Sequence, residues 1–320
     1  MVLEVIERYK YINESRTISM DNSLTIITPT YNRAYTLEAL YHSLIQQTDL
    51  DFLWLVVDDG STDSTKELIS QFIEQNIIKI RYIKQNNQGK HIAWNTGVSN
   101  ANTAISFILD SDDTLVEEAV EIIKNDWKLA QKDDLIGIAY LWGAGNREKV
   151  VGKEFPKNYM IDTLNNVKYN LGIDGDKAIA YDTEKLKSVP FPQIPGERFL
   201  SEGVVWKQLS HKGKMLFINK IIYIANYAED GLTKSGSRVL LIKNPIGLML
   251  NCKLTMTKEF TLKVRVKFGL LYIAYGFFAK KKVGEIISES EQPRLIMPLI
   301  PFGWLIYRVW GYKYKDKLAS

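Results

Sequence analysis

Cysteine is almost missing from this chain. Cys252 is the only cysteine in 320 residues, so no disulfide can form within the chain, and a reducing compartment such as the cytoplasm suits this composition.

Long apolar runs are missing as well. The two longest uncharged stretches of the C-terminal region, residues 268–279 and 295–307, hold 12 and 13 residues, whereas a helix that spans a bilayer needs about 20. The first 23 residues also lack such a run, so we expect neither a spanning helix nor a signal peptide.

Acidic residues are scarce near the C-terminus. Residues 243–320 hold 14 Lys and Arg against 5 Asp and Glu, and the net charge of the whole chain is +4, so the rest of the chain is near −5. Aromatic residues alternate with these basic ones, as in Trp304, Tyr307, Arg308, Trp310, Tyr312, Lys313, Tyr314 and Lys315. This mixture is typical of a helical segment that lies in the interface of an anionic membrane. The alternative is a helical appendage that packs on the core. Nucleic-acid binding is disfavoured, because the basic residues lie within aliphatic runs.

Strand and helix patterns alternate over the first half of the chain. Apolar, strand-like runs are predicted at 24–28, 52–58, 78–83 and 104–109, and helical patterns at 37–45, 64–74, 90–98 and 115–130. This βαβ spacing predicts a mostly parallel sheet flanked by helices. The loops that follow the strands are then expected to meet at one edge of the sheet, where open α/β sheets bind ligands.

The pattern loosens after residue 130. Strands are predicted at 135–141 and 177–181, with a long polar stretch between them, and a helix at 203–209. Residues 215–218 and 221–225 predict a β-hairpin, because two apolar runs flank the polar pair 219–220.

Three carboxylates follow the predicted strand 104–109. Asp110, Asp112 and Asp113 are close enough in sequence for their negative charges to repel one another. A divalent metal that holds a phosphorylated substrate would neutralise them. The alternative is an acidic turn that caps the helix beginning near residue 115.

Three other loops supply what a pyrimidine nucleotide needs. Tyr31 follows the first strand and offers a stacking face for the base. Asp58 or Asp59, after the second strand, can accept a hydrogen bond from N3–H. Lys90 follows the third strand, and together with a metal on Asp112 it can bind a diphosphate.

Read in order, these four loops resemble the inverting glycosyltransferases of family 2, which have the GT-A fold. The matching stretches are IITPTYN at 26–32, VVDDGSTD at 56–63, NQGK at 87–90 and DSDD at 110–113, and the resemblance covers roughly residues 23–230. It implies a UDP-sugar donor and Mn²⁺ or Mg²⁺. It also implies the following roles: Pro29 and Tyr31 line the uridine pocket, Asp59 faces the uracil, Asp58 is mainly structural, Asn87 and Lys90 bind the nucleotide and its diphosphate, Asp110 contacts ribose or sugar, and Asp112 binds the metal.

The resemblance also implies a catalytic base from the second half of the chain. The family carries a Glu-Asp motif before a helix, and here Glu202 and Gly203 stand at that place, with Gly203 in place of the Asp. Glu202 is the expected base, because an inverting transfer needs a carboxylate to take the proton of the attacking hydroxyl. Asp176 and Trp206 are expected near the donor sugar or the acceptor, and Asp176 is a secondary candidate for the base. No ligand role is assigned to the histidines, and the third metal ligand stays open.

These inferences predict three regions: an N-terminal extension at 1–23, a GT-A catalytic domain at 24–240, and a basic, aromatic-rich helical region at 241–320. The catalytic domain divides into a nucleotide-binding half at 24–115 and an acceptor-binding half at 116–240. The expected function is sugar transfer to a hydroxyl of a lipid-linked or polymeric glycan, at the cytoplasmic membrane face, in cell-surface polysaccharide synthesis. A sugar-nucleotide nucleotidyltransferase and a degenerate, non-catalytic scaffold are the alternatives, and a homo-oligomer stays open.

Overall fold

The computed structural model describes residues 23–226 and 237–319, which form two compact units. The first unit contains residues 23–163, Ile173–Pro190 and 212–226, and the second contains Leu164–Gly172, Phe191–His211 and 237–319. The predicted N-terminal extension lies outside the described residues, apart from Ser23. The boundaries predicted at residues 23 and 240 remain predictions.

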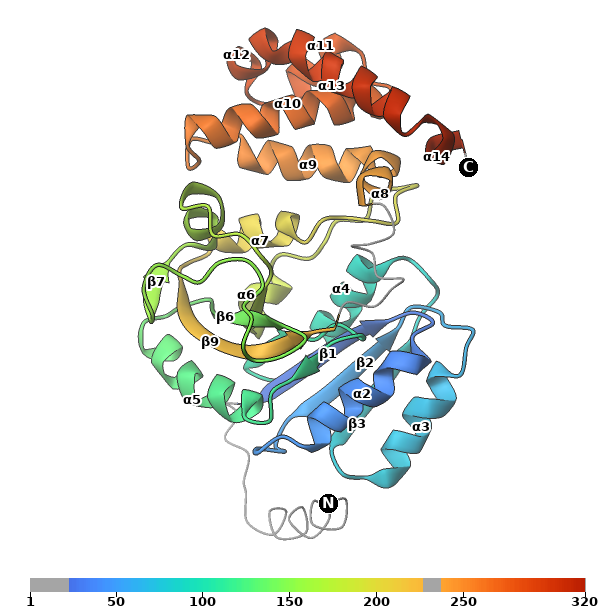
Figure 1. Ribbon diagram of the computed structural model, residues 1–320, viewed down its shortest axis with the longest axis vertical. Coiled ribbons are helices and arrows are strands. Elements are labelled where there is room, and N and C mark those ends of the chain that lie inside the picture. Colours follow the sequence, from blue (N-terminus) through green and yellow to red (C-terminus); the bar gives the residue numbers. More distant parts are fainter. Residues whose placement is uncertain (1–22, 227–236, 320) are drawn as a thin grey trace. The chain divides into compact units, whose positions relative to one another are not determined.

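The first unit alternates strands and helices along the chain (Figure 1). Its elements are β1 (Leu24–Thr30), α2 (Ala34–Ile45), β2 (Leu53–Asp58), α3 (Thr65–Gln75), β3 (Lys79–Lys84), α4 (Lys90–Asn100), β4 (Ile105–Ile108), β5 (Thr114–Leu115), α5 (Ala119–Lys132), β6 (Gly137–Ala144), β7 (Met160–Asp162), β8 (Lys177–Asp182), α6 (Thr183–Lys187) and β9 (Met215–Ala225). The strands and helices predicted in the first half of the sequence are therefore present, with the differences in extent given below.

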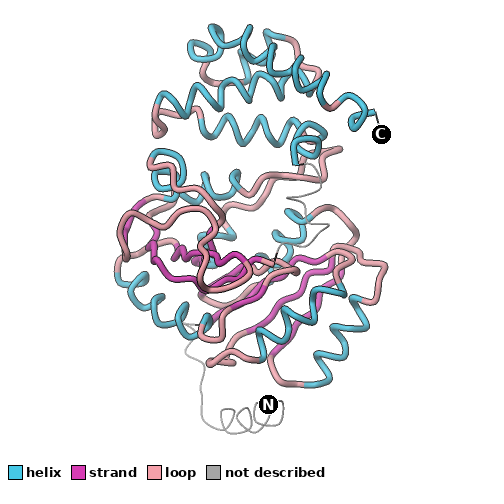
Figure 2. The backbone as a smooth tube through the Cα atoms, viewed as in Figure 1, coloured by secondary structure: helices cyan, strands magenta, loops and turns pink. Residues whose placement is uncertain are grey.

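The strands lie side by side in one sheet, in the order β3-β2-β1-β4-β8-β6-β9-β5, with β7 paired to β9 (Figure 2). The strands β3, β2, β1 and β4 are mutually parallel. From β8 onwards the sheet is mixed, because β8 is antiparallel to both β4 and β6, whereas β6 and β9 are parallel. The prediction of a mostly parallel sheet is thus correct for the first four strands and wrong beyond them. Because those four strands share a direction, the loops after their carboxyl ends lie along one edge.

Helices cover both faces of this sheet. The main core packs apolar residues of α2, α3 and α5 against one face, including Leu40, Phe72 and Trp127. On the other face α4 approaches closely at Gly97, where a Cβ would lie 2.3 Å from Ile27. Strands β1, β2 and β4 are largely buried between these layers and are rich in apolar residues, whereas the edge strand β3 is exposed or half-buried along its length.

Strand β1 continues through Pro29 to Thr30, two residues beyond the predicted end. A proline is tolerated there because of where the ladder hydrogen bonds are made. Asp59 N donates to Thr30 O on the side of β2, and Leu109 N donates to Ile27 O on the side of β4. The backbone nitrogen of Pro29 faces the β4 side, but it lies beyond the last residue of β4 that pairs with β1. The missing N–H of Pro29 therefore breaks no hydrogen bond of the ladder.

The predicted hairpin at 215–225 is wrong, because β9 is one continuous strand. The polar pair at its centre makes a bulge against β6 rather than a turn. The side chain of Asn219 accepts from Phe155 N at 2.8 Å and donates to Phe155 O at 2.9 Å, so it pairs as a strand backbone would. The helix predicted from residue 115 also begins later: residues 114–115 pair with β9 as β5, and α5 begins at Ala119.

The second unit is helical in its described residues. Its elements are the π-helix η2 (Asn166–Asn170), α7 (Gly203–Ser210), α8 (Ser237–Lys243), α9 (Pro245–Thr255), α10 (Leu262–Phe278), α11 (Val283–Glu289), α12 (Pro293–Ile296), the 3₁₀ turn η3 (Met297–Leu299), α13 (Ile300–Lys313) and α14 (Lys315–Ala319). A separate core joins α9, α10, α11 and α12. Within residues 23–226 and 237–319, no helix has the length and apolar character that crossing a bilayer requires.

Candidate active site

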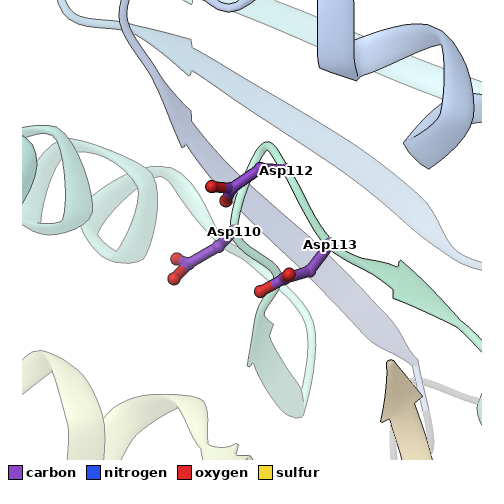
Figure 3. A group of neighbouring side chains, drawn as sticks. All are labelled: Asp110, Asp112 and Asp113. Atoms are coloured by element: carbon purple, nitrogen blue, oxygen red, sulfur yellow. The ribbon is translucent and has the colours of Figure 1, made fainter. Parts of the chain in front are cut away.

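An acidic turn lies at the carboxyl end of β4 and leads into β5. Asp110, Asp112 and Asp113 each place a carboxylate oxygen within 4.8 Å of the others. Figure 3 shows the three carboxylates gathered on one side of the turn. The predicted cluster therefore forms in space as well as in sequence.

A buried tyrosine from a distant strand holds this turn in place. The hydroxyl of Tyr223, in β9, donates to Asp113 Oδ2 at 2.7 Å and accepts from Asp110 N at 3.2 Å. Asn226 N donates to the other oxygen of Asp113 at 2.8 Å. The ring of Tyr223 stacks on Trp142, with centroids 4.2 Å apart. Both oxygens of Asp113 are thus oriented by residues that lie more than 100 positions away in sequence.

The electrostatics of the turn favour a cation. Burial raises the pKa of Asp113 to about 7, even though the hydroxyl of Tyr223 acts to lower it. Burial also raises the pKa of Asp112, and the neighbouring Asp110 adds to that shift. Lys90 Nζ lies 2.8 and 2.9 Å from the two carboxylate oxygens of Asp110 and compensates part of the negative charge.

The donor set fits a hard divalent cation. Clustered carboxylate oxygens are the ligands that Mg²⁺ and Mn²⁺ prefer, and no soft sulfur or imidazole ligand belongs to this cluster. Asp112 stays the predicted ligand, and Asp110 and Asp113 are near enough to share the ion. The sequence placed Asp113 in the acidic cluster but gave it no separate role.

The two carboxylates after β2 hold neighbouring loops. Asp58 is fully buried and accepts from Ser61 N at 2.7 Å and from the hydroxyl of Tyr82. Asp58 therefore orients the turn that follows β2. The carboxylate of Asp59 accepts from three donors of the loop after β3, namely Gln85 Nε2 at 2.7 Å, Gln88 N at 2.9 Å and Gly89 N at 2.8 Å. Of these three donors, only Gly89 N donates to Asp59 Oδ2. This oxygen can therefore accept a further hydrogen bond.

The loop after β1 is tied to the loop after β2. Asn32 has a left-handed backbone, with φ 51°, which asparagine tolerates better than most residues. Its N–H donates to Ser61 Oγ at 2.9 Å, and its side-chain oxygen accepts from Thr62 N at 2.8 Å. The preceding Tyr31 keeps 47 % of its surface exposed, so its ring is open to a stacking partner. The motif residues Asn32 and Ser61 could have been singled out by the left-handed preference of Asn and by the Asp-Gly-Ser turn.

A shallow pocket of about 690 Å³ lies between the loops after β2 and β3. It is lined by Gly60, Ser61, Thr62, Lys84, Gln85, Asn86 and Asn87. Gly60 has φ 87°, and a Cβ there would lie 2.9 Å from Asn87 N, so the close approach of the two loops requires glycine. Asn87 therefore lines this pocket, and the lining residue Gly60 directly follows Asp58 and Asp59 in the sequence.

The predicted base lies in the second unit. Glu202 is half-buried and is the N-cap residue of α7, and its carbonyl accepts from Trp206 N at 3.1 Å. One turn later, the ring of Trp206 lies under the ammonium of Lys168, with 3.9 Å between Nζ and the ring centroid. Glu202 and Trp206 thus occupy consecutive turns of one helix.

Two reciprocal contacts fix the segment that precedes Glu202. The carboxylate of Glu197 accepts from Ile246 N at 2.6 Å and from Gly247 N at 2.7 Å, at the start of α9. In return, Asn244 Oδ1 accepts from the N–H groups of residues 198 and 199, at 2.9 and 3.1 Å. Burial raises the pKa of Glu197. Neither role was predicted, because the partners are 45 to 50 residues apart in sequence.

Asp176 lies in the first unit, exposed in the loop before β8. The first unit thus brings the predicted residues to the carboxyl ends of β1, β2, β3 and β4: Tyr31, Asp59, Asn87, Asp110 and Asp112 lie in the loops, Asp58 is the last residue of β2, and Lys90 is the first residue of α4. Pro29 is buried in β1. Among the histidines, His211 Nε2 lies 2.8 Å from Glu259 Oε2 in the second unit, and His91 is buried in α4.

The comparison with protein families decides where this arrangement belongs. Residues 25–189, more than half of the chain, match the model of glycosyl transferase family 2. The chain belongs to this family. The resemblance seen in the sequence is therefore confirmed.

Several curated relatives of this family-2 chain are bacterial glycosyltransferases. The chain is 35% identical to the glycosyltransferase GlyA of Streptococcus pneumoniae over 121 residues, which cover 38% of this chain and 17% of GlyA. It is 27% identical to the glycosyltransferase GlyG of the same organism over 215 residues, 64% of this chain and 71% of GlyG. It is 29% identical to the poly(ribitol-phosphate) beta-N-acetylglucosaminyltransferase TarP of Staphylococcus aureus over 126 residues, 38% of each. The chain spans from a sixth to about a third of the length of the first curated relatives it matches.

Solved structures share the fold. Residues 1–349 of S. aureus TarS, in complex with UDP-GlcNAc, match with a TM-score of 0.61 at 18% identity, over 92% of each chain. The mannosyltransferase PcManGT of Pyrobaculum calidifontis, in complex with GDP-Man and Mn²⁺, matches with a TM-score of 0.53 at 17% identity, over 97% of this chain and 90% of that one. At these identities the match shows the fold alone.

Proposed function

We propose that this family-2 protein is a metal-dependent, inverting glycosyltransferase that uses a UDP-sugar. The observation that carries the proposal is the acidic turn at the end of β4, where Asp110, Asp112 and Asp113 converge beside Lys90. The loops after β1, β2 and β3 begin at the same edge of the sheet as this turn. A nucleoside diphosphate is the ligand that uses a stacking face, acceptors for the base and a cation-binding turn together.

Each part of the donor has a proposed partner in the first unit. The uracil would stack on Tyr31 and donate N3–H to Asp59, in the loops that Asn32 and Ser61 tie together. Lys90 and a cation held by Asp112 would bind the diphosphate, and Asp110 would contact ribose or sugar. A bound Mn²⁺ or Mg²⁺ would stabilise the negative charge that develops on the departing UDP. The TarS complexes with UDP and UDP-GlcNAc support a UDP-sugar as the donor.

Glu202 is the proposed general base. Its carboxylate would take the proton of the acceptor hydroxyl as that oxygen forms a bond to C1 of the sugar. The bond between C1 and the diphosphate oxygen breaks on the opposite face, UDP leaves with the electron pair, and the configuration at C1 inverts. Trp206, one turn along α7, would contact the sugar or the acceptor, and Asp176 is the secondary candidate for the base.

The acceptor is proposed to be a hydroxyl of a lipid-linked or polymeric glycan in cell-surface polysaccharide synthesis. The names of two relatives support this class: TarP, and the chondroitin synthase of Escherichia coli, which is 29% identical over 199 residues, 57% of this chain and 29% of the synthase. A hexose or an N-acetylhexosamine is the corresponding sugar. With a lipid-linked acceptor, the protein is proposed to act at the cytoplasmic membrane face as a peripheral protein.

The test is UDP release from a panel of UDP-sugars in the presence of Mn²⁺. We expect one UDP-sugar to be hydrolysed or transferred, and Asp112→Ala to lose at least about a hundredfold in rate because the charge on the leaving group is no longer neutralised. Asp133→Ala, an exposed carboxylate at the end of α5, is the matched control and should keep full activity.

Three outcomes would overturn the proposal. Undiminished turnover in a folded Asp112→Ala variant would remove the metal role. Pyrophosphate release from a nucleoside triphosphate and a sugar phosphate would instead show a nucleotidyltransferase. A protein that does not bind UDP with Mn²⁺ would be a scaffold without catalysis.

A further inference from the structure

Helix α13 carries large apolar side chains on its solvent side. Phe302, Leu305, Val309 and Tyr312 are 61, 56, 53 and 87 % exposed. Their spacing of three, four and three residues places them along one stripe of the helix. We call this set the outer stripe. A surface helix of a protein that contacts only water normally presents charged and polar residues there, so the stripe needs a partner.

The opposite side of α13 is already packed within the second unit. A Cβ at Gly303 would lie 2.5 Å from Ile273 of α10, so the two helices are in close contact there. The ring centroids of Tyr307 and Phe278 are 4.8 Å apart, and those of Trp310 and Tyr275 are 5.8 Å apart. The apolar residues of the outer stripe are therefore not needed for the core of this unit.

Basic residues flank the outer stripe on both sides. At 100° per residue, exposed Arg308 lies on one side of the stripe and exposed Lys313 on the other. Residues 292–315 contain no Asp or Glu. The stripe and its flanks together form an apolar surface with an uncompensated positive rim.

We propose that the outer stripe of α13 binds an anionic membrane surface, with the helix lying in the plane of the interface. Apolar side chains would enter the boundary between headgroups and acyl chains, and Arg308 and Lys313 would remain at the level of the lipid phosphates. The proposal deepens the peripheral location in the proposed function, and it rests on that function only for the lipid-linked acceptor.

Charge argues against a second copy of this chain as the partner. In a two-fold contact the same surface faces itself. The basic Arg308 and Lys313 of one copy would then face the same basic surface of the other copy, which has no acidic residue of α12 or α13 to pair with them, and like charges in such a contact are destabilising. A layer of anionic lipid supplies the missing negative charge.

The experiment measures co-sedimentation of the full chain with phosphatidylcholine vesicles, with and without about 30% phosphatidylglycerol. We expect binding only to the anionic vesicles. Leu305→Ser/Val309→Ser should require at least about tenfold more lipid for half-binding, and Arg308→Gln/Lys313→Gln about tenfold more as well. Leu129→Ser/Lys128→Gln, an exposed apolar and basic pair on α5, is the matched control and should bind as the unaltered protein does.

All variants change exposed side chains, and equal thermal unfolding would confirm that they are folded. UDP release should be unchanged in the outer-stripe variants, so a chain that binds vesicles without turning over any UDP-sugar would contradict the transferase alone. Equal binding of the serine variant, or no binding to anionic vesicles, would overturn the membrane contact. Self-association without lipid that the serine variant abolishes would show that the stripe joins copies of the chain, and would overturn it too.

Discussion

The hydroxyl of Tyr223 is a single buried group on which the acidic turn depends. It accepts from the backbone of Asp110 and donates to the side chain of Asp113, so it fixes both ends of the turn at once. Groups that orient metal ligands in this way change metal affinity even though they do not touch the ion.

Tyr223→Phe is therefore expected to weaken Mn²⁺ binding by about tenfold and to lower the free energy of unfolding by about 1–2 kcal/mol. Titration calorimetry with Mn²⁺ and urea unfolding measure the two effects. Tyr41→Phe is the control, because it also removes a tyrosine hydroxyl of the first unit, one that donates to Gln75 Oε1 at 2.9 Å away from the turn. Equal Mn²⁺ affinity in Tyr223→Phe and the unaltered protein would contradict this role.

Lys207 is a second residue with an effect beyond its immediate contacts. Its side chain is fully buried in the second unit, and Nζ donates to Asn251 Oδ1 at 2.5 Å. Nζ also lies 4.7 Å from the ring centroid of Tyr169 and 5.5 Å from that of Phe268. Burial lowers the pKa of Lys207 to about 7; the nearby Cys252 opposes that shift.

This shift predicts how stability depends on pH. The unfolded chain keeps Lys207 protonated up to its ordinary pKa near 10.5, whereas the folded chain releases the proton near 7. Because the unfolded state binds the extra proton, the free energy of unfolding rises with pH in this window, by up to about 1.4 kcal/mol per pH unit. Urea unfolding between about pH 7.5 and 8.5 measures the rise. Lys207→Met should remove it, and the exposed Lys258→Met should keep it. A rise that persists in Lys207→Met would show that another group causes it.

At the scale of elements, the sequence predicts the strands and helices that depend on local periodicity. It does not predict those that depend on pairing between distant segments. The strands and helices from β1 to α4 follow from apolar runs and turn residues that are local. The continuity of β9 does not, because it depends on the pairing of Asn219 with Phe155, 64 residues away. The short strand β5 likewise exists because it pairs with β9.

The same division applies to the candidate site. The loops with Asp59, Lys90 and Asp112 were predicted together because parallel strands end at one edge. The contacts of Tyr223 with the acidic turn span 110 residues or more, and no short motif encodes them.

The start of helix α9 depends on a side chain from another segment. Glu197 accepts from the first free N–H groups of α9, which have no partner within the helix. Glu197→Ala should therefore lower the free energy of unfolding by about 1–2 kcal/mol, measured by urea unfolding. Glu202→Gln is the contrast: it should reduce sugar transfer by about 10²–10⁴-fold, because the amide cannot take the proton of the attacking hydroxyl. Normal transfer in Glu202→Gln would move the base to another carboxylate.

At the scale of the whole molecule, the second unit is assembled from three separated stretches of chain. Residues 164–172 and 191–211 interrupt the first unit in sequence, and they contact helices that follow residue 240. Asn165 Nδ2 donates to both oxygens of Glu259, at 3.0 and 3.1 Å, and Lys207 binds Asn251. The helices after residue 240 are thus part of the unit that carries Glu202.

A chain truncated after residue 240 is therefore expected to lose more than its membrane contact. Lys207 would lose Asn251, Asn165 would lose Glu259, and the start of α9 would no longer hold Glu197. Since unpaired buried polar groups cost about 1–3 kcal/mol each, α7 should open, and limited proteolysis should cut rapidly within residues 164–172 and 191–211. Truncation after residue 314, which removes only α14, is the control and should resist cleavage there. A chain of residues 1–240 that is soluble and resists proteolysis would show instead that the last helices are a separable appendage.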